Sequence, residues 1–354
     1  MTTLGEEGRP PSGGWPRWWL RRGAAACALL PLAALFAVLA RLRRLLWDSG
    51  WLKPWRAPVP VVVVGNVTAG GSGKTPLVAE IARALRDAGW HPGIVSRGYG
   101  RRRGAAGPLP VLPDSAAIDT GDEPLLLRRL CDCPVWVAGN RPAAARALLR
   151  EHPQVDVLLS DDGLQHFALA RDLQLVVLDA RGVGNGWPLP AGPLRECPRR
   201  PRDATLGPAQ AEARAPQPFF ALRRSAGALR NVGDGRVLSL GEFRAQYAAT
   251  PISAVAAIGH PQQFFAMLRD AGLPLARTAT VRDHRDIPEK LLQDLPGQVL
   301  TTEKDALKCR RGQPGLERLW AVQLRLEVDP AFIPWLLARL RRAASRSPDG
   351  FTSA

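Results

Sequence analysis

A glycine-rich loop between a strand-like run and a helix-like run limits the fold more than any other feature of this chain. Residues 59–64 (V-P-V-V-V-V) are typical of a strand buried on both faces, and an apolar helical pattern runs from residue 76 to about residue 88. The loop between them, residues 65–75, reads G-N-V-T-A-G-G-S-G-K-T. Its backbone N–H groups and the amino terminus of the following helix favour a bound anion. The order of strand, loop and helix therefore predicts a phosphate-binding site in an α/β domain.

The loop departs at one position from the strict G-x-x-x-x-G-K-[ST] pattern, because Thr68 stands where that pattern has glycine. A glycine-rich surface turn is the alternative interpretation, but the strand before the loop and the helix after it favour nucleotide binding. Lys74 would then reach the β- and γ-phosphates, and Thr75 would coordinate Mg²⁺. The residues expected to bind ATP are Thr68, Ala69, Gly70, Gly71, Ser72, Gly73, Lys74 and Thr75.

Two adjacent aspartates follow a second apolar run and are the candidate metal ligands. Residues 155–160 (V-D-V-L-L-S) are strand-like and lead into Asp161 and Asp162. Like charges side by side in a cleft repel each other unless a cation lies between them, so the pair indicates a metal ion or a substrate nearby. Which of the two aspartates contacts Mg²⁺ stays open. His166 follows them closely and is either a substrate-side group or a structural histidine.

Three further polar features have both a functional and a simpler explanation. Asp122 and Glu123 begin a helix-like run, where carboxylates are also favourable without any catalytic role. Asp179 follows the strand-like run 173–178 and is either a metal ligand or a solvated turn carboxylate. The arginine-rich residues 96–103 (S-R-G-Y-G-R-R-R) suit a bound phosphate group. Spacing alone leaves these alternatives open.

An uncharged run of 18 residues, 23–40, lies near the amino terminus. As a helix it would be roughly 27 Å long, just enough to cross a hydrocarbon core of about 30 Å. Residues 1–56 contain six of the eleven Trp, and nine Lys/Arg against three acids. Aromatic rings and cations at the ends of an apolar helix are typical of a bilayer interface. We expect a membrane anchor that either spans the bilayer or lies in one leaflet; a cleaved signal peptide and a buried core helix are the alternatives.

The net charge of +16 and the five cysteines narrow the classes of function. The cysteines form no zinc-type pairs, so neither a disulfide framework nor a structural metal is expected. The charge would suit nucleic acid, but the sequence has no helix-turn-helix, zinc-finger or RNA-binding aromatic signature. We therefore expect inner-membrane lipids and a phosphorylated substrate as partners, with no nucleic acid and no obligate protein partner.

Short motifs follow one another over about residues 15–325, after the tryptophan-flanked start of the chain. They are R-A-P-V-P-V-V-V-V-G-N-V-T-A-G-G-S-G-K-T-P (56–76), V-S-R-G-Y-G-R (95–101), G-D-E-P (121–124), D-D-G-L-Q-H (161–166), G-P-L-R-E (192–196), I-G-H-P-Q-Q-F-F (258–265), D-H (283–284) and T-E-K-D-A-L-K-C (302–309). Together and in this order they resemble the tetraacyldisaccharide 4′-kinases, the lipid A kinases of Gram-negative bacteria. Thr68 agrees with this resemblance.

The resemblance implies that the chain transfers the γ-phosphoryl group of ATP to the 4′-hydroxyl of an acylated glucosamine disaccharide 1-phosphate, giving lipid IVA. It implies that Asp122 and His284 take the hydroxyl proton, and that Arg195 and Glu196 lie on the substrate side. A substrate with four acyl chains stays in the bilayer, so the expected location is the bacterial inner membrane, with the active site on its cytoplasmic side. The alternative is a membrane-docked P-loop ATPase that acts as an assembly or transport switch.

Alternating strand-like and helix-like runs predict an α/β fold of the P-loop NTPase type: a mostly parallel sheet with helices on both faces and the ligand at the carboxyl ends of the strands. A smaller C-terminal α/β domain and an N-terminal hydrophobic helix complete it. Because Lys74 and His284 fall in different domains, catalysis is expected to need domain closure. The expected segments are an anchor (1–56), a kinase domain (57–200), a linker (201–250), the smaller domain (251–342) and a disordered tail (343–354).

Overall fold

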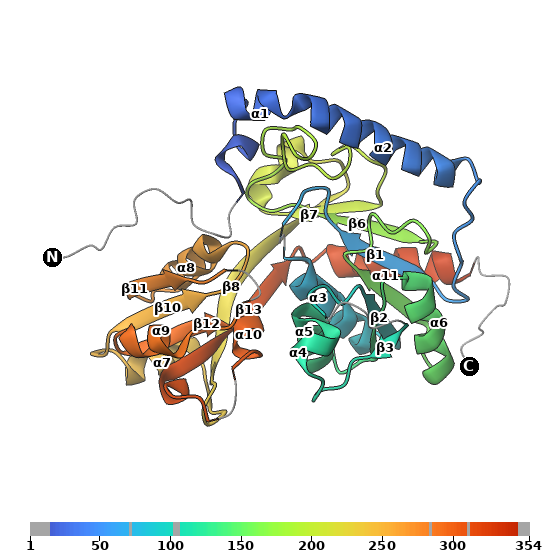
Figure 1. Ribbon diagram of the computed structural model, residues 1–354. Coiled ribbons are helices and arrows are strands. Elements are labelled where there is room, and N and C mark those ends of the chain that lie inside the picture. The colour runs from blue at the N-terminus through green and yellow to red at the C-terminus, as the bar shows by residue number, and fades with distance from the viewer. Residues whose placement is uncertain (1–14, 71–72, 102–106, 283–284, 310–311, 346–354) are drawn as a thin grey trace. The chain divides into compact units, whose positions relative to one another are not determined.

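The computed structural model describes residues 15–70, 73–101, 107–282, 285–309 and 312–345, and the chain divides into two compact units (Figure 1). The larger unit contains Trp18–Arg223 and the chain from Leu326 onward. The smaller unit contains Arg224–Arg325.

The larger unit is built on a sheet that is parallel except at one edge. Its strand order is β8-β7-β6-β1-β5-β2-β4-β3, and of the described pairs between neighbours in this order only β3–β4 is antiparallel. Valine and leucine fill the central strands because both of their faces are buried. This confirms the expected mostly parallel α/β sheet. The strands are β1 (Val61–Gly65), β2 (Pro92–Ser96), β3 (Leu109–Pro110), β4 (Val135–Val137), β5 (Val157–Asp161), β6 (Leu173–Val177), β7 (Ala204–Gly207) and β8 (Phe219–Asn231).

Helices of the larger unit begin where the local sequence supplies a helix start. Helix α3 follows Gly73, whose left-handed backbone (φ +77°) turns the phosphate loop into the helix. Helix α6 follows Asn140, whose side chain accepts a hydrogen bond from the N–H of Ala143. The helical segments are η1 (Arg17–Trp19), α1 (Ala24–Ala28), α2 (Leu30–Asp48), α3 (Lys74–Asp87), α4 (Ala117–Thr120), α5 (Asp122–Cys131), α6 (Arg141–Glu151), η2 (Ala209–Arg214) and α11 (Phe332–Ala344).

The smaller unit has its own sheet and its own aromatic core. Strands β11, β10, β12 and β13 are neighbours and parallel, whereas the hairpin partner β9 pairs antiparallel with β8. Phe243, Phe265 and Trp320 are fully buried in its core. The remaining elements are β9 (Val237–Leu238), α7 (Leu240–Gln246), β10 (Ile252–Ala256), α8 (Pro261–Asp270), β11 (Leu275–Thr280), α9 (Glu289–Asp294), β12 (Gln298–Thr302), α10 (Glu303–Ala306), η3 (Leu316–Arg318) and β13 (Leu319–Val328).

The boundaries between the units differ from those expected from the sequence. The expected linker 201–250 instead contains β7, β8, β9 and α7, and the division between the units falls inside β8 and β13. The closing helix α11 belongs to the larger unit, although the expected smaller domain included it. Proline and arginine suggested a linker, but strand pairing is decided by partners far away in the sequence.

The amino-terminal apolar run forms two helices. The expected single rod 23–40 is divided at Leu29 into α1 and α2, and α2 continues to Asp48. Figure 1 shows α2, in blue, lying over the segment that joins β6 to β7. Among the described residues, no helix combines the length and apolarity needed to cross a bilayer.

Candidate active site

The phosphate loop connects β1 to α3 and places one lysine at the edge of the sheet. Lys74 is the first residue of α3, and its side chain is only 9% exposed. Its Nζ lies 3.2 Å from Oδ1 of Asn66 and 3.3 Å from Oδ1 of Asp162. Thr75 follows it and is also buried. The ammonium group is therefore held at the start of the helix, where phosphate groups bind in loops of this kind.

A second segment runs along the phosphate loop and is hydrogen-bonded to it. The N–H of Ala69 donates to the carbonyl of Pro193, and the N–H of Arg195 donates to the carbonyl of Val67, both at 2.8 Å. Thr68 lies between these bonds, is buried, and pairs with Leu194 as an isolated bridge. A β-branched residue suits this extended conformation better than the glycine of the strict pattern.

The same segment supplies a second cation to the site. Nη1 of Arg195 lies 3.5 Å from Oδ2 of Asp162, so this carboxylate contacts both Arg195 and Lys74. Burial alone would raise the pKa of Asp162. The positive charges of Lys74 and then of Arg195 outweigh this and hold the pKa below its ordinary value. The backbone of Asp162 is left-handed (φ +48°), a conformation that non-glycine residues adopt rarely and often at functional sites.

Asp161 has the opposite electrostatic environment. It ends β5 beside β1, is 1% exposed, and its Oδ1 has no hydrogen-bond partner among the described residues. Burial, followed by the charges of Glu123 and Asp162, raises the pKa of Asp161 to about 7. The two aspartates thus differ in their side-chain contacts: Asp162 forms ion pairs with Lys74 and Arg195, whereas Oδ1 of Asp161 is buried and accepts no hydrogen bond among the described residues.

The donor set at this edge fits a hard divalent cation. The hydroxyl of Thr75 and the carboxylate of Asp161 are oxygen donors, and Mg²⁺ in nucleotide sites takes few protein oxygens beside phosphate and water. The observation that best supports a bound Mg²⁺ is Oδ1 of Asp161, which is buried without a hydrogen-bond partner among the described residues. The described residues contain no cluster of three or more His, Cys, Asp or Glu side chains that could hold a metal by themselves. This small set of protein oxygens agrees with a metal site in which the phosphates of a nucleotide supply further ligands.

Asp122 lies at the amino terminus of α5, near the same edge. Gly121 before it has φ +93°, and a Cβ there would lie 2.7 Å from the carbonyl oxygen of Tyr99, so only glycine fits. The charge of the next residue, Glu123, contributes to the raised pKa of Asp161. His284 lies outside the described residues, as do Gly71 and Ser72 of the phosphate loop. The pairing of Asp122 with His284 therefore stays a prediction.

His166 has a structural contact that the sequence did not indicate. Its Nε2 accepts a hydrogen bond from the backbone N–H of Arg141, the first residue of α6, at 3.1 Å. Burial, and then the charge of Arg141, lowers the pKa of His166 to about 4, so the ring is neutral near pH 7. A contact of His166 with the substrate stays a prediction.

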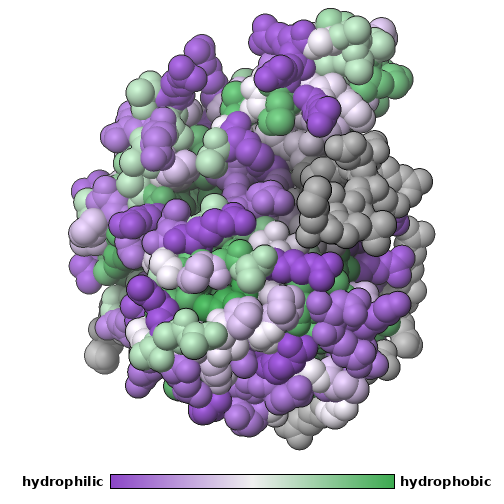
Figure 2. Space-filling view, turned by 90° about the vertical axis from the view of Figure 1, so that its left-hand side faces the viewer, coloured by the Kyte–Doolittle hydropathy of each residue, from purple (hydrophilic) through white to green (hydrophobic). Residues whose placement is uncertain are grey.

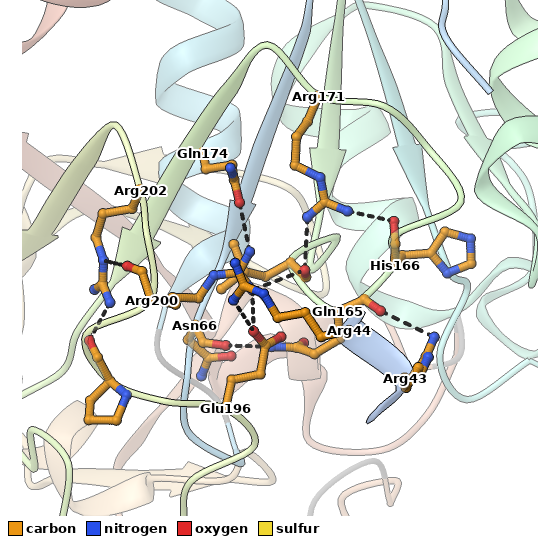
Figure 3. A network of polar contacts seen from close by, with 12 residues as sticks. Arg43, Arg44, Asn66, Gln165, His166, Arg171, Gln174, Glu196, Arg200 and Arg202 are labelled. Carbon is orange, nitrogen blue, oxygen red and sulfur yellow. Dashed lines mark hydrogen bonds and ion pairs between the residues drawn. The ribbon is translucent and has the colours of Figure 1, made fainter. Parts of the chain in front are cut away.

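Glu196 belongs to a network of arginines beside the site, shown in Figure 3. Its Oε2 forms a short ion pair with Arg200 and lies 4.0 Å from Nη1 of Arg44. Arg171 donates to the carbonyls of Leu164 and His166, both at 2.9 Å. This places the Glu196 carboxylate among cations of the protein; its contact with the substrate stays a prediction.

The structure adds site residues that the sequence reasoning missed. Asn66 contacts Lys74, and Gln165 donates to the carbonyl of Asn66 at 3.1 Å. Arg141 is buried and donates to the carbonyl of Asp161 at 3.1 Å. Asn66 and Gln165 lie within motifs that were identified, so their position after strands was an available signal. Arg141 lies outside those motifs, and nothing in its local sequence indicated this contact.

One alternative for Asp179 was wrong. Its side chain is not solvated but buried, and it pairs with Arg181, which contacts it through the backbone N–H and the guanidinium group. Such pairing satisfies a buried carboxylate. The cause is tertiary burial of the turn, which residue type alone does not reveal.

Comparison with known proteins agrees with this geometry. The family model described as tetraacyldisaccharide-1-P 4′-kinase matches residues 25–341. The chain is 44% identical over 342 residues to the tetraacyldisaccharide 4′-kinase of Herminiimonas arsenicoxydans (92% of this chain and 94% of that protein), and 45% identical over 331 residues to that of Janthinobacterium sp. strain Marseille (91% and 94%).

A solved structure is similar over nearly the same extent. It is the crystal structure of the "apo" form of LpxK from Aquifex aeolicus in complex with ATP. Its TM-score is 0.72 at 28% sequence identity, and the match covers 89% of this chain and 99% of the other. With this fold, the arrangement around Lys74 and the extent of the sequence matches, the chain belongs to the tetraacyldisaccharide 4′-kinase family.

Proposed function

We propose that this chain transfers the γ-phosphoryl group of ATP to the 4′-hydroxyl of tetraacyldisaccharide 1-phosphate, with lipid IVA as product. The observation that carries the proposal is the position of Lys74, whose Nζ lies within 3.3 Å of Asp162 where the phosphate loop meets the end of β5. Family membership supports the acceptor, and the related structure with ATP supports the donor.

Phosphoryl transfer depends mainly on positioning and on charge stabilisation. In this proposal, the N–H groups of the phosphate loop bind the β- and γ-phosphates, and Lys74 compensates the charge that develops on the bridging oxygen. Arg195 supplies a second cation from the segment that is hydrogen-bonded to the loop. Both cations are already held by Asp162, so little reorganisation is needed in the transition state.

Magnesium would be held by the hydroxyl of Thr75 and by Asp161 or Asp162. When bound there, it neutralises phosphate charge and orients the transferred group. The unpartnered oxygen of Asp161 supports this role.

The general base is assigned to Asp122 and His284, following the family resemblance. A carboxylate that contacts an imidazole fixes its tautomer and raises its basicity, which suits proton removal near neutral pH. Asp122→Asn and His284→Ala should each lower kcat, and the double variant should lose much less than the product of the two single losses. Losses that multiply fully would show that the residues act separately.

The membrane surface is proposed as the place of reaction, at the cytoplasmic side of the inner membrane where ATP is present. Helix α2 carries large apolar side chains on its outer face, and the four at Leu32, Leu35, Leu39 and Leu42 are 52–56% exposed. Its opposite face contains the buried Ala33 and Arg44, which lies 4.0 Å from Glu196. The side of α2 that faces away from the protein is therefore apolar too. An exposed apolar helix face of this kind indicates contact with an apolar environment outside the protein.

Arg41 and Arg43 of α2 are exposed close to this apolar face. Figure 2 shows apolar and hydrophilic residues side by side at the top of the view, where Figure 1 places α1. Cations next to an apolar helix face favour anionic lipid, at about 1 kcal/mol for each basic side chain near the surface. We therefore assign a lipid bilayer, rather than a protein partner, to the outer face of α2.

Vesicle sedimentation tests this assignment. Each buried leucine contributes about 1.5–3 kcal/mol, so Leu35→Glu with Leu39→Glu should lower partition into phosphatidylglycerol-containing vesicles at least tenfold. Val237→Glu is the matched control, because Val237 is 53% exposed on β9 of the smaller unit. Equal partition of the double variant and the control would contradict the assignment.

The reaction itself is tested by incubating the full chain with labelled ATP, Mg²⁺ and tetraacyldisaccharide 1-phosphate in mixed micelles. Label on the disaccharide, lost in Lys74→Ala, is the expected result. Release of labelled phosphate to water with none on the lipid would refute the kinase proposal and would favour an ATP-driven switch.

A further inference from the structure

We propose that Arg44 of α2 is a positioning residue, which orients the active-site loops when the outer face of α2 is bound to the bilayer. The proposal rests on the membrane location and reaction proposed above. It concerns how the inner side of the same helix acts on the site, and it does not require Arg44 to touch ATP or the lipid.

Two loops hold the charged groups of the site and lack regular structure of their own. Residues 162–172 join β5 to β6 and begin with Asp162, and residues 193–196 contain Arg195. The Asp162–Arg195 distance of 3.5 Å therefore depends on how the two loops are held relative to each other.

Helix α2 contacts both loops through one face. Nη2 of Arg43 donates to the carbonyl of Gln165 at 3.3 Å, and its guanidinium lies 5.7 Å from the ring centre of Phe167, which also packs against Trp47. Nη1 of Arg44 lies 4.0 Å from Oε2 of Glu196, the neighbour of Arg195. Figure 3 shows Arg43 directed at Gln165 and Arg44 directed at Glu196. One helix thus contacts the loop of Asp162 and the loop of Arg195.

The side of Glu196 away from α2 is firmly held. Arg200, whose side chain is 2% exposed, pairs with Oε2 of Glu196 and donates to Gln174 at 2.7 Å and to the carbonyl of Leu164 at 3.3 Å. The guanidinium of Arg200 thereby fixes one side of the Glu196 carboxylate against the sheet and against the other loop.

The contact on the α2 side is adjustable. Arg44 is 30% exposed, its Nε donates to Oδ2 of Asp48 at 3.2 Å, and its Nη1 lies 4.0 Å from Glu196, so the ion pair with Glu196 is weak by itself. Arg44 also repels Arg200, whose pKa is lowered first by burial and in part by Arg44. The other carboxylate oxygen of Glu196, Oε1, is buried without a hydrogen-bond partner in the described part of the chain, so it can accept a closer Arg44.

The two faces of α2 connect lipid binding with the active-site loops. Its leucines face outward, whereas Arg44 faces the carboxylate next to Arg195. Lipid binding to the outer face restricts the helix and lowers the entropy cost of holding a long arginine side chain on Glu196. Docking therefore favours the loop arrangement in which Arg195 and Asp162 are paired, at the place where the lipid acceptor is found.

The test compares Arg44→Ala with Arg41→Ala, which removes the same charge from an exposed position on the same helix. On vesicles containing the acceptor, Arg44→Ala should lower kcat at least tenfold, while the KM for ATP and vesicle partition stay within twofold of those of Arg41→Ala. Arg44→Lys should recover most of the loss. A kcat within twofold of the control, or a vesicle partition that falls together with kcat, would overturn the proposal.

Two further measurements separate this proposal from the proposed reaction. In a Glu196→Gln background, Arg44→Ala should change kcat less than twofold; a full tenfold loss there would show that Arg44 acts elsewhere. Hydrogen exchange of peptides covering residues 162–172 and 193–200, on vesicles without substrate, should be faster in Arg44→Ala than in Arg41→Ala. Equal exchange would overturn the positioning role whether or not the chain phosphorylates the lipid.

Discussion

The neutral state of His166 has a measurable consequence for stability. Its pKa is about 4 in the folded chain, because burial and Arg141 disfavour the charged ring, whereas an unperturbed histidine has a pKa of about 6.5. Between these values the unfolded chain binds a proton that the folded chain does not bind. The free energy of unfolding therefore falls as the pH falls from about 6.5 to about 4, and this contribution is fully present above pH 6.5.

The size of the effect follows from the shift. A difference of one pKa unit corresponds to 1.36 kcal/mol, so the change from 6.5 to about 4 sets an upper bound of about 3 kcal/mol, which solvent screening of this half-buried ring reduces to about 1–2 kcal/mol. His166→Gln removes the titration and keeps an oxygen that can accept the hydrogen bond from the N–H of Arg141. The wild type should thus lose about 1–2 kcal/mol more than His166→Gln between pH 7 and pH 4.

Urea unfolding in a fixed concentration of mild detergent, followed by tryptophan fluorescence at each pH, measures this difference. Only the difference between the two proteins is used, because other groups titrate equally in both. Parallel pH profiles of the wild type and His166→Gln would refute the reasoning, since they would mean that His166 can be protonated in the folded chain at no cost.

Three further substitutions test the site. Lys74→Ala should lower kcat at least 10³-fold in the labelled-ATP assay, since it removes the cation at the phosphate loop; a loss below tenfold would exclude its role in the transition state. Asn66→Ala removes the 3.2 Å contact with Lys74 and should lower kcat about tenfold with no change in thermal stability above a few degrees, as scanning calorimetry would show; unchanged kcat would mean that Asp162 alone positions Lys74. Gly121→Ala should cost about 1–3 kcal/mol in urea unfolding because of its φ of +93° and the 2.7 Å approach to Tyr99, whereas Gly139→Ala, with open space around its Cβ position, should cost much less; equal costs would contradict the steric argument.

Much of the nucleotide side of the site could be read from local sequence. A strand, a glycine loop and a helix in succession predict a phosphate site because each is recognised within a few residues, and Lys74 lies where the loop pattern requires. Asp161 was also placed correctly at the end of a strand. Sequence did not distinguish Asp161 from Asp162, because their pKa values depend on burial and on Lys74, Arg195 and Glu123, which come from other elements.

The interpretations that changed were those that depend on partners far away in the chain. His166 contacts the start of α6, Asp179 is buried, and the expected linker contributes strands because their pairing partners lie elsewhere. Helix α2 is the clearest case, since its composition indicated a membrane but not that one face contacts the loops of Asp162 and Arg195.

The amino-acid sequence by itself determined the phosphate loop and the family, because short motifs in a fixed order identify both, and the mostly parallel sheet, because strand-like and helix-like runs alternate along the chain. Only the tertiary structure decided which carboxylate is paired, which histidine is neutral and which side of α2 faces the protein. These properties arise from burial and from groups brought together across 25 to 152 residues of chain, about which local patterns contain no information.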